Sequence, residues 1–271
     1  MFNKFDFLGK TVSMYSIIAI AGMLISGFFI CRAVKRRGYD DTDAVIVLCF
    51  ATLGAFIGSH LLYALTNFRY FHEYLNVNSF SEFAALSYKI FGGSIFYGGL
   101  FGGIAIGYLA LRRVPIKKAD FLDVMSFGAP LFHGIARIGC FFGGCCYGIE
   151  SAIGFTAHGN DWVAEVNDVS RFPVQLLESL GCFIIAGVMT YLLSKKKLHG
   201  RLFFLYLICY GILRFSDEYL RGDAIRGFIG VFSTSQIISV ITVVISLILF
   251  FKPKPDIDEA SHELRKPEYT R

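Results

Sequence analysis

Long apolar runs separated by short polar groups dominate the chain. Seven of these runs are each long enough to form a helix across a bilayer, whose hydrocarbon core requires about 20 mostly apolar residues. They lie near residues 12–34, 44–66, 91–113, 119–140, 173–194, 201–220 and 232–251. The pattern predicts an all-α membrane protein with seven transmembrane helices in one polytopic membrane domain, residues 1–251, followed by a polar tail, residues 252–271.

The basic residues predict which way these helices run. Lysine and arginine gather after the first, third, fifth and seventh runs, and cytoplasmic connections of membrane proteins carry an excess of these residues. We therefore expect the N-terminus outside the cell and the C-terminal tail in the cytosol. The four groups are Lys35, Arg36 and Arg37; Arg112, Arg113, Lys117 and Lys118; Lys195, Lys196 and Lys197; and Lys252 and Lys254.

Three polar segments complete the organisation. Residues 67–90 are aromatic and polar, which is typical of a short amphipathic helix at the membrane interface. Residues 149–172 form a second long segment on the same, outer side. The tail mixes both charges without apolar periodicity, so it is expected to be disordered. No small-residue cleavage site follows the first apolar run, and we expect that run to be retained as a helix.

Composition narrows the class of protein. Of 271 residues, 55% are hydrophobic and 17% are charged, against about 25% charged in a typical soluble domain. The net charge of +5 arises from basic groups in the connections between apolar runs. This arrangement favours a membrane protein and argues against a nucleic-acid partner.

The run ARIGCFFGGCCYG, residues 136–148, places Arg137 at the end of the fourth apolar segment. A charged side chain at the centre of a spanning helix costs at least about 2.5–3.5 kcal/mol. Arg137 is therefore expected to meet a ligand or a carboxylate, the alternative being that it reaches the headgroups. The glycines that follow it allow a ligand to approach the backbone closely.

A second charged group, RFSDEYLRGD, lies at the end of the sixth run, on the same expected outer side. Arg214 and Glu218 are four residues apart and share a helix face; Asp217 and Arg221 extend the group. The group is either an ion pair that fixes helix packing or a phosphate site, because guanidinium groups match phosphate oxygens. We expect Arg137 and Arg214 to converge on one anion, with Glu218 holding a guanidinium in place.

Two other motifs carry polar side chains in apolar surroundings. FGGSIFYGGLFGGIAIGY, residues 91–108, contains three glycine pairs that permit close helix packing, and Tyr97 lies among them. Its hydroxyl is a candidate to reach a cavity. RFPVQLLES, residues 171–179, carries Gln175 and Glu178, which either bridge helices or belong to the site.

The seven cysteines fall into two classes. Four lie inside apolar runs, where cysteine usually packs as a small hydrophobe. Cys140, Cys145 and Cys146 form the second class, and a disulfide or a catalytic thiol is possible there. The adjacent pair Cys145 and Cys146 is awkward for one tetrahedral zinc ion. The sequence therefore predicts no metal.

With these motifs in hand, the chain resembles the prolipoprotein diacylglyceryl transferase family. The resemblance covers nearly all the apolar runs, in order, and implies seven helices with an outer N-terminus. It rests on the motifs SMYSIIAIAGM, GSHLLYAL, YGGLFGG, ARIGCFFGGCCYG, RFPVQLLES, YGILRFSDEYLRGD and STSQIISV.

The resemblance implies a reaction and its partners. Phosphatidylglycerol would donate its diacylglyceryl group to the lipobox cysteine of a prolipoprotein signal peptide, with release of glycerol phosphate. The enzyme would work among membrane lipids as a multi-pass protein of the bacterial cell membrane, with its active site toward the outer face. The reaction requires no metal or organic cofactor.

The family's lipid and catalytic positions map onto particular residues of this sequence. The resemblance implies substrate-binding roles for Tyr15, Tyr63, Gly148 and Arg221, and for the two arginines Arg137 and Arg214 as well. The expected catalytic set is Tyr97, Arg137, Cys140, Arg214 and Glu218.

Three positions depart from the family pattern. Tyr97 stands where the family has histidine, Cys140 stands where it has asparagine, and Cys145 or a neighbour stands where it has an acidic residue. A tyrosine with a pKa near ~10 is a poorer base than histidine. The group that takes the proton of the acceptor thiol is therefore open between Tyr97 and one of the cysteines.

Two alternative functions fit parts of this pattern. A related transferase that uses a different acceptor would explain the departures at Tyr97 and Cys140. A lipid-binding or transport protein without catalysis is the other alternative. Transporter sites tend to lie near the middle of the bilayer, whereas the charged motifs here lie at one expected edge.

Overall fold

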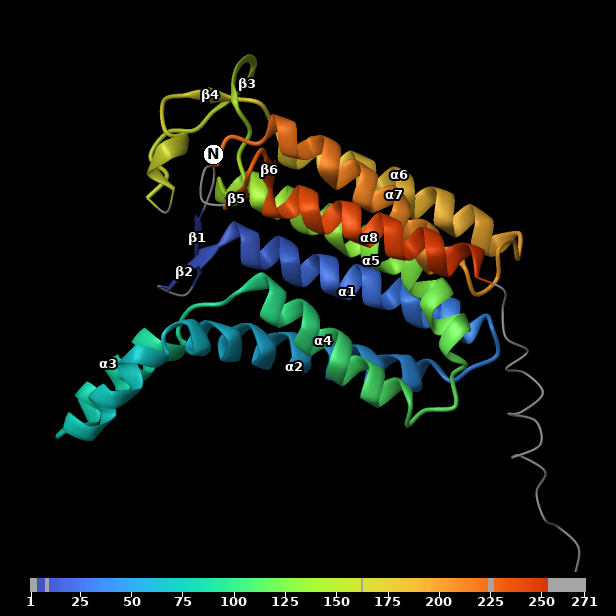
Figure 1. Cartoon of the computed structure of the whole chain (residues 1–271), viewed down its shortest axis with the longest axis horizontal. Coiled ribbons are helices and arrows are strands. Elements are labelled where there is room, and N and C mark those ends of the chain that lie inside the picture. The colour runs from blue at the N-terminus through green and yellow to red at the C-terminus, as the bar shows by residue number, and fades with distance from the viewer. Residues whose placement is uncertain (1–3, 8–9, 162, 224–226, 253–271) are drawn as a thin grey trace, which may run out of the picture.

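The structure is a computed structural model that describes residues 4–7, 10–161, 163–223 and 227–252. Residues 253–271 of the predicted tail lie outside the described residues. The fold is a helical bundle with small strand pairs at one end (Figure 1). Its helices are α1 (Met14–Lys35), α2 (Asp41–Thr66), α3 (Phe80–Phe91), α4 (Phe96–Leu111), α5 (Lys118–Gly143), α6 (Val174–Ser194), α7 (Leu202–Asp217) and α8 (Thr234–Phe251).

The shorter elements form hairpins and single turns. Three two-stranded sheets are described, each antiparallel. They pair β1 (Lys4–Phe7) with β2 (Lys10–Ser13), β3 (Glu150–Thr156) with β4 (Ser170–Arg171), and β5 (Phe228–Ile229) with β6 (Phe232–Ser233). The 3-10 helices are η1 (Phe68–Asn76), η2 (Ala164–Val166) and η3 (Glu218–Leu220).

All seven predicted runs contain a helix, but the number of spans that the structure supports is smaller. Within the described residues, α1, α2, α5, α6 and α8 are long and apolar enough to cross a membrane, and the bent pair α3–α4 raises the number from five to six. α4 and α7 have 16 residues each. At 1.5 Å per residue they are about 24 Å long, against a hydrocarbon core of about 30 Å. A count of seven spans is therefore not confirmed.

The third apolar run is broken in the structure. Residues 91–113 were expected to form one helix, whereas α3 ends at Phe91, α4 begins at Phe96, and the two are bent by 84°. The Gly92–Gly93 pair occupies the break. The helix expected within residues 67–90 is present as α3, whose Leu86 and Ile90 are buried together with Ala64 of α2. α3 extends away from the bundle beyond the end of α2 (Figure 1).

Glycines bring α2 and α4 into close contact. An added Cβ at Gly58 would overlap the carbonyl of Gly98, and one at Gly102 would overlap the carbonyl of Gly54. The glycines on each helix are four residues apart, so they repeat on one face. In lipid, helices associate through such small residues because backbone can approach backbone. The glycine pairs in this run thus serve helix packing.

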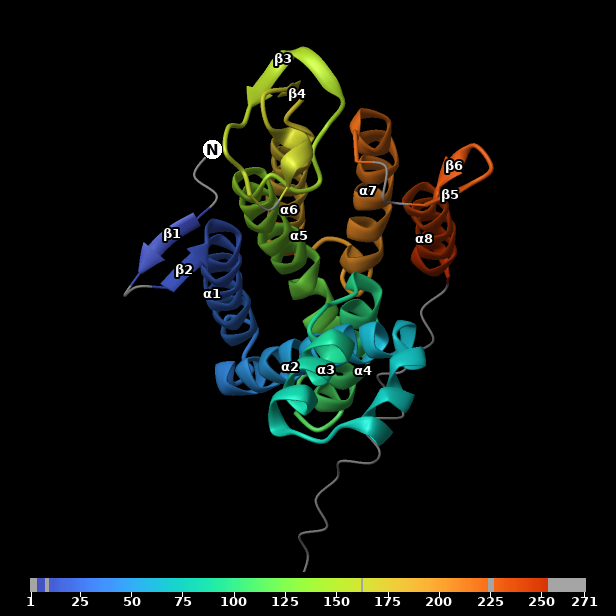
Figure 2. The same cartoon turned by 90° about the vertical axis from the view of Figure 1, so that its left-hand side faces the viewer.

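The other helices pack in the order α1, α5, α6, α7 and α8 (Figure 2). α5 is the most buried of the candidate spans and contacts α1, α6 and α7. Asp123 of α5 fixes the position of α7: its buried carboxylate accepts hydrogen bonds from the backbone N–H groups of Gly200 (2.6 Å) and Leu202 (3.2 Å). This contact sets the relative position of the two helices that carry Arg137 and Arg214.

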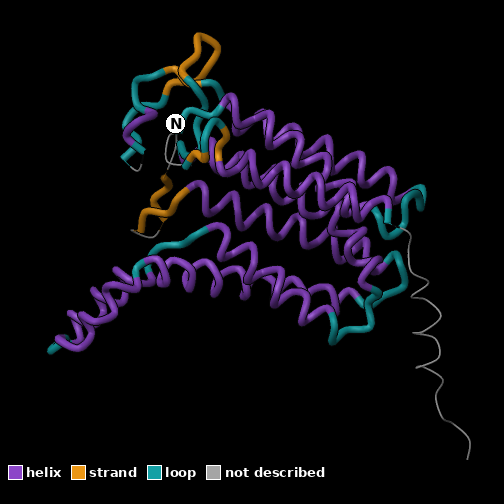
Figure 3. The backbone as a smooth tube through the Cα atoms, viewed as in Figure 1, coloured by secondary structure: helices purple, strands orange, loops and turns teal. Residues whose placement is uncertain are grey.

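The two ends of the bundle differ in chemistry. The connections α1–α2, α4–α5 and α6–α7, which hold the basic groups, meet at one end (Figures 1 and 3). The segment 144–173, with β3 and β4, lies at the opposite end together with the start of α1 and the end of α7. We call these the basic end and the head end. The predicted alternation of basic and non-basic connections thus matches two separate ends.

We predict that Gly102→Leu destabilises the protein by roughly 1–3 kcal/mol, because an overpacked side chain forces α2 and α4 apart. The measurement is thermal unfolding of the purified protein in detergent. Gly187→Leu is the matched control, since an added Cβ at Gly187 of α6 meets nothing within 4 Å. An unchanged melting temperature for Gly102→Leu, equal to that of the control, would show that this contact does not support the fold.

Candidate functional site

A buried ion pair joins α5 to α6 at the head end. Arg137 Nη2 lies 2.5 Å from Glu178 Oε2, and the side chains of the two residues are only 11% and 2% exposed. The other carboxylate oxygen accepts a hydrogen bond from the Tyr210 hydroxyl of α7 (3.1 Å) and lies 3.3 Å from His133 Nε2. Glu178 is thus the carboxylate that meets Arg137. Buried charges are tolerated only when paired and hydrogen-bonded in this way.

A second ion pair forms where the spacing predicted it. Arg214 Nη1 of α7 lies 2.6 Å from Glu218 Oε2 at the start of η3. Arg214 Nη2 donates a hydrogen bond to the Ser235 hydroxyl (3.0 Å), which belongs to the first turn of α8. That turn is fixed by a capping box in which Ser233 and Gln236 exchange hydrogen bonds. The STSQ motif therefore positions one arginine of the site.

The two ion pairs belong to one cluster of charges. Tyr210, which bonds Glu178, lies one turn before Arg214 on the same helix. The buried carboxylate of Asp217 interacts electrostatically with Glu178, with Arg214 and Arg137, and with Arg221. Helices α5, α6 and α7 thus bring the two charged motifs of the sequence together at the head end. Glu218 holds Arg214, as expected, whereas Glu178 holds Arg137.

Part of the cluster's hydrogen-bonding capacity is unused. Among the described residues, the buried Arg137 Nε and the buried Asp217 Oδ2 have no hydrogen-bond partner. An unmet buried polar atom costs about 1–3 kcal/mol. Such atoms are rare in folded proteins, so this cluster has donor and acceptor positions that remain free for another molecule.

The loop after α5 connects this cluster to Arg221. Gly148 forms a backbone bridge with Arg221, and the Arg221 guanidinium pairs with Asp223 at 2.6 Å. An added Cβ at Gly148 would overlap the carbonyl of Phe172 and lie 3.0 Å from that of Leu220. Glycine at 148 is therefore required for the two segments to meet.

Three thiols lie beside the arginines. The Sγ atoms of Cys140, Cys145 and Cys146 all lie within 4.8 Å of one another, and none is in a disulfide. Arg137 Nη1 is 3.9 Å from Cys140 Sγ. In the loop after α5, hydrogen bonds with the other two thiols lower the pKa of Cys146, and the charges of Arg137 and Arg221 lower it further against desolvation by burial.

The sequence argument against a metal relied on the adjacency of Cys145 and Cys146. Successive side chains of an extended chain point in opposite directions. Cys146, however, has a φ of +56°, in the left-handed region that non-glycine residues seldom adopt. This conformation allows the neighbouring thiols to converge, so the adjacency no longer excludes a shared ion.

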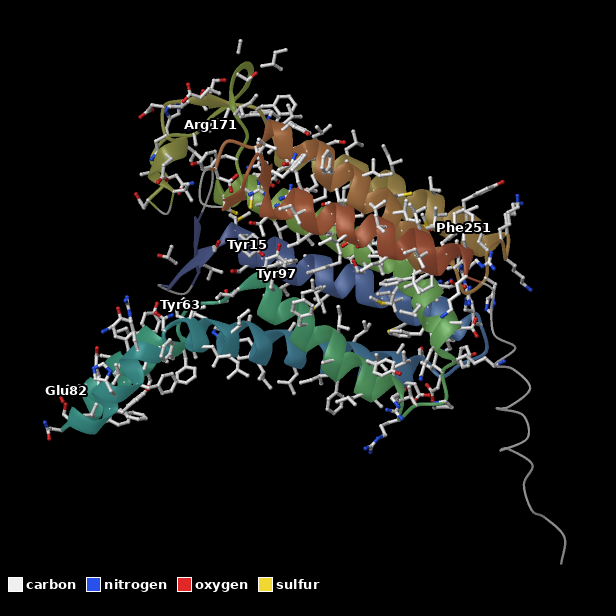
Figure 4. All side chains as sticks on the ribbon, viewed as in Figure 1. Tyr15, Tyr63, Glu82, Tyr97, Arg171 and Phe251 are labelled. Carbon is white, nitrogen blue, oxygen red and sulfur yellow. The ribbon has the colours of Figure 1, made fainter. Side chains whose placement is uncertain are left out.

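The three tyrosines proposed for the site occupy different places, all toward the head end (Figure 4). Tyr15, in the first turn of α1, packs against α5, since an added Cβ at Gly139 would lie 3.3 Å from its ring. Arg137 and the three thiols act on it electrostatically. Tyr63 packs on Gly93 in the α3–α4 break, and Tyr97 contacts Phe96. Within the described residues, neither has a hydrogen bond or ion pair to the arginine cluster.

A small pocket with a cavity volume of about 20 Å³ lies next to residues 144–148, the loop after α5 that carries Cys145 and Cys146 and that we call the thiol loop. It is not lined by Arg137 or Arg214, so it lies beside the charged cluster rather than within it. Its lining residues are Phe141, Gly144, Tyr147, Phe155, Ala157, Val166, Arg171, Phe172, Pro173 and Gln175.

The sequence did not identify every member of the cluster. Tyr210 and His133, which both contact Glu178, were absent from the expected set, and Glu178 was left open between a structural and a functional role. The available signal was a carboxylate inside an apolar helix, which requires a partner in the same way as Arg137 does.

Comparison with known proteins agrees with this architecture. The model of the prolipoprotein diacylglyceryl transferase family matches residues 4–252. Among similar proteins, the phosphatidylglycerol–prolipoprotein diacylglyceryl transferase of Clostridium tetani is 27% identical over 91% of this chain and 95% of its own length. The corresponding protein of Clostridioides difficile is 29% identical over 89% of this chain and 90% of its own length.

A further relative is named phosphatidylglycerol–prolipoprotein diacylglyceryl transferase 2, from Clostridium perfringens. It is 28% identical over 90% of this chain and 92% of its own length. The family match spans the described helices from α1 to α8 and includes both arginine motifs. The chain therefore belongs to the prolipoprotein diacylglyceryl transferase family.

Proposed function

We propose that the protein transfers the diacylglyceryl group of phosphatidylglycerol to the lipobox cysteine of a prolipoprotein and releases glycerol phosphate. Membership of the family and the names of its relatives support this reaction. The observation that carries it onto this chain is the pair of buried guanidinium groups at one end of an apolar helical bundle. A lipid headgroup with a phosphate is the anion that such a bundle meets in a membrane.

The phosphate would be held by Arg137 and Arg214. Glu178 positions the guanidinium of Arg137, and Glu218 positions that of Arg214. Each guanidinium has five N–H groups in all, so further N–H groups can donate to a phosphate. Arg137 Nε is buried without a partner among the described residues. Positive charge fixed at this place stabilises the negative charge that develops on the departing glycerol phosphate, and a water-poor site strengthens that effect.

The chemistry would take place outside the cytosol. The positive-inside rule supports a cytoplasmic position for the basic end. The head end, with Arg137 and Arg214, would then lie at the outer face of the bacterial cell membrane. In this arrangement all seven apolar runs cross the bilayer, α4 and α7 included, and the N-terminus lies outside. Local thinning of the bilayer or tilt of neighbouring helices accommodates the two short helices.

The acceptor thiol must lose a proton before it attacks. Within the described residues, Tyr97 contacts Phe96 and has no hydrogen bond or ion pair with the arginines, so its contacts do not identify it as the base. Tyr15, Tyr63, Gly148 and Arg221 are proposed to contact the lipid or the peptide.

A transferase with a different acceptor is the second candidate, and the unusual residues Tyr97 and Cys140 favour it. One assay separates the two candidates. The purified protein is incubated with phosphatidylglycerol and a lipobox peptide, and the mass of the peptide is then measured. A peptide that stays unmodified under conditions in which glycerol phosphate is released would favour the second candidate.

We predict that Arg137→Ala and Arg214→Ala each lower the rate of transfer to the lipobox peptide by about 100-fold or more, the loss that follows removal of one fixed donor to a developing anion. Arg32→Ala, at the basic end of α1, is the control and is expected to retain full activity. Wild-type rates in both site variants would refute the phosphate clamp.

We also predict the orientation. A green fluorescent protein fused after residue 271 is expected to be fluorescent, since it folds in the cytosol. Alkaline phosphatase inserted at Gly159, a turn in the head-end segment with nothing near its Cβ position, is expected to be active, since it requires an oxidising exterior. The reverse pair of results would place the arginine cluster on the cytoplasmic side.

A further inference from the structure

We infer that Cys140, Cys145 and Cys146 bind one zinc ion as thiolates, and that the fourth position of this ion receives the thiol of the acceptor cysteine. The inference deepens the proposed function and rests on it for the identity of the acceptor. In this proposal the zinc ion activates the acceptor thiol. Tyr97 has no contact among the described residues that would let it do so.

The donor set is arranged before any metal binds. Three Sγ atoms lie within 4.8 Å of one another. Zinc–sulfur bonds of 2.3 Å in a tetrahedron place sulfur atoms about 3.8 Å apart, so the thiols need to move by about 1 Å at most to bind one ion. Thiolate ligands select soft or borderline metals such as zinc.

The thiol loop is held in place by hydrogen bonds from two neighbouring segments. Gln175 Nε2 donates to the carbonyl of Cys145 at 2.9 Å, and Asn160 Nδ2 donates to the carbonyl of Gly143 at 3.2 Å. Gly144 and Cys146 both have positive φ, which turns the chain so that Cys145 and Cys146 face Cys140. The sequence RFPVQLLES thus contributes Gln175 to the support of the thiol loop.

The number of donors indicates a catalytic rather than a structural zinc site. Structural zinc sites are closed by four protein ligands, whereas catalytic sites have three and leave one position for water or substrate. Within the described residues, the group contains three thiols and no histidine or carboxylate. A fourth ligand must therefore come from outside the group.

The charges around the thiols suit such an ion. Zinc with three thiolates carries a net charge of −1. The positive charge of Arg137 acts on Cys140 and Cys146, and that of Arg221 acts on Cys146. Arg137 is also proposed to bind the phosphate of the donor lipid, and it lies 3.9 Å from Cys140 Sγ. A nucleophile bound to the zinc and a leaving group bound to the arginine would therefore lie side by side.

The chemical step balances without a protein base. The acceptor thiol displaces zinc-bound water and releases its proton to solvent, because a thiol coordinated to zinc is deprotonated. Its sulfur then forms a bond to the glyceryl carbon, while the bond from that carbon to the phosphate ester oxygen breaks and the electron pair leaves with glycerol phosphate. The thioether product is a neutral, weak ligand, so water replaces it.

The test begins with metal content. The full-length protein, purified in detergent, is exposed to zinc chloride and dialysed. We expect about one zinc ion per chain in the wild type and loss of that zinc in Cys140→Ser, Cys145→Ser and Cys146→Ser. Cys49→Ser, an exposed thiol of α2, is the matched control and retains zinc. Wild-type protein that retains no more zinc than the three site variants would overturn the inference.

X-ray absorption of the zinc-loaded wild type makes the test independent of variants that fail to fold. We expect three sulfur neighbours at about 2.3 Å, and a fourth after addition of a lipobox peptide. A peptide with serine in place of the cysteine is the control and leaves three. Zinc surrounded by nitrogen and oxygen would overturn the site, and three sulfurs that do not change with the thiol peptide would overturn its role toward the acceptor.

The transfer reaction, measured in parallel, separates the two proposals. Activity that persists in protein shown to hold no zinc refutes the metal-bound thiol while the proposed function stands. Bound zinc with three sulfurs, a fourth sulfur from the peptide and no transfer from phosphatidylglycerol refutes the proposed function while the thiol-binding zinc site stands.

Discussion

A guanidinium group inside an apolar helical bundle is stable only where a carboxylate meets it, and the arrangement of the site depends on this constraint. Arg137 and Glu178 come from different helices and form an ion pair in which Glu178 is almost fully buried. Removing one partner of such a pair leaves an uncompensated charge. The pair therefore fixes α5 against α6, and Tyr210 extends the same interaction to α7. Around it, the Arg214–Glu218 pair, Asp217 and Arg221 gather at the head end of the bundle.

This constraint also links structure to proposed chemistry. The carboxylates hold the guanidinium groups in place before a lipid arrives, so that little reorganisation is required when a phosphate binds. Glycine at 148 lets the thiol loop approach the segment that holds Arg221. The loop in turn places the thiols of Cys145 and Cys146 next to that of Cys140 of α5, which lies beside Arg137. In the motif of residues 136–148, the arginine is thus proposed to bind phosphate, the glycines allow close backbone contacts, and the cysteines form the thiol group.

Features that depend on local sequence were predictable. The positions of the helices followed from apolar runs, and the Arg214–Glu218 pair followed from a spacing of four residues. Features that depend on contacts between distant segments were not. The partner of Arg137 lies on the next long helix, and nothing local to either residue identifies the other. The left-handed conformation of Cys146 and the bend between α3 and α4 arise from the packing of whole segments, so the sequence pattern predicted neither.

The central claim is that Arg137 and Arg214 together bind the phosphate of an anionic phospholipid. The most direct measurement is an experimental structure of the protein in a lipid nanodisc that contains phosphatidylglycerol. The account predicts density for one phosphate group within hydrogen-bonding distance, about 2.7–3.2 Å, of both guanidinium groups. A headgroup bound elsewhere, with the two arginines contacting only Glu178 and Glu218, would contradict it.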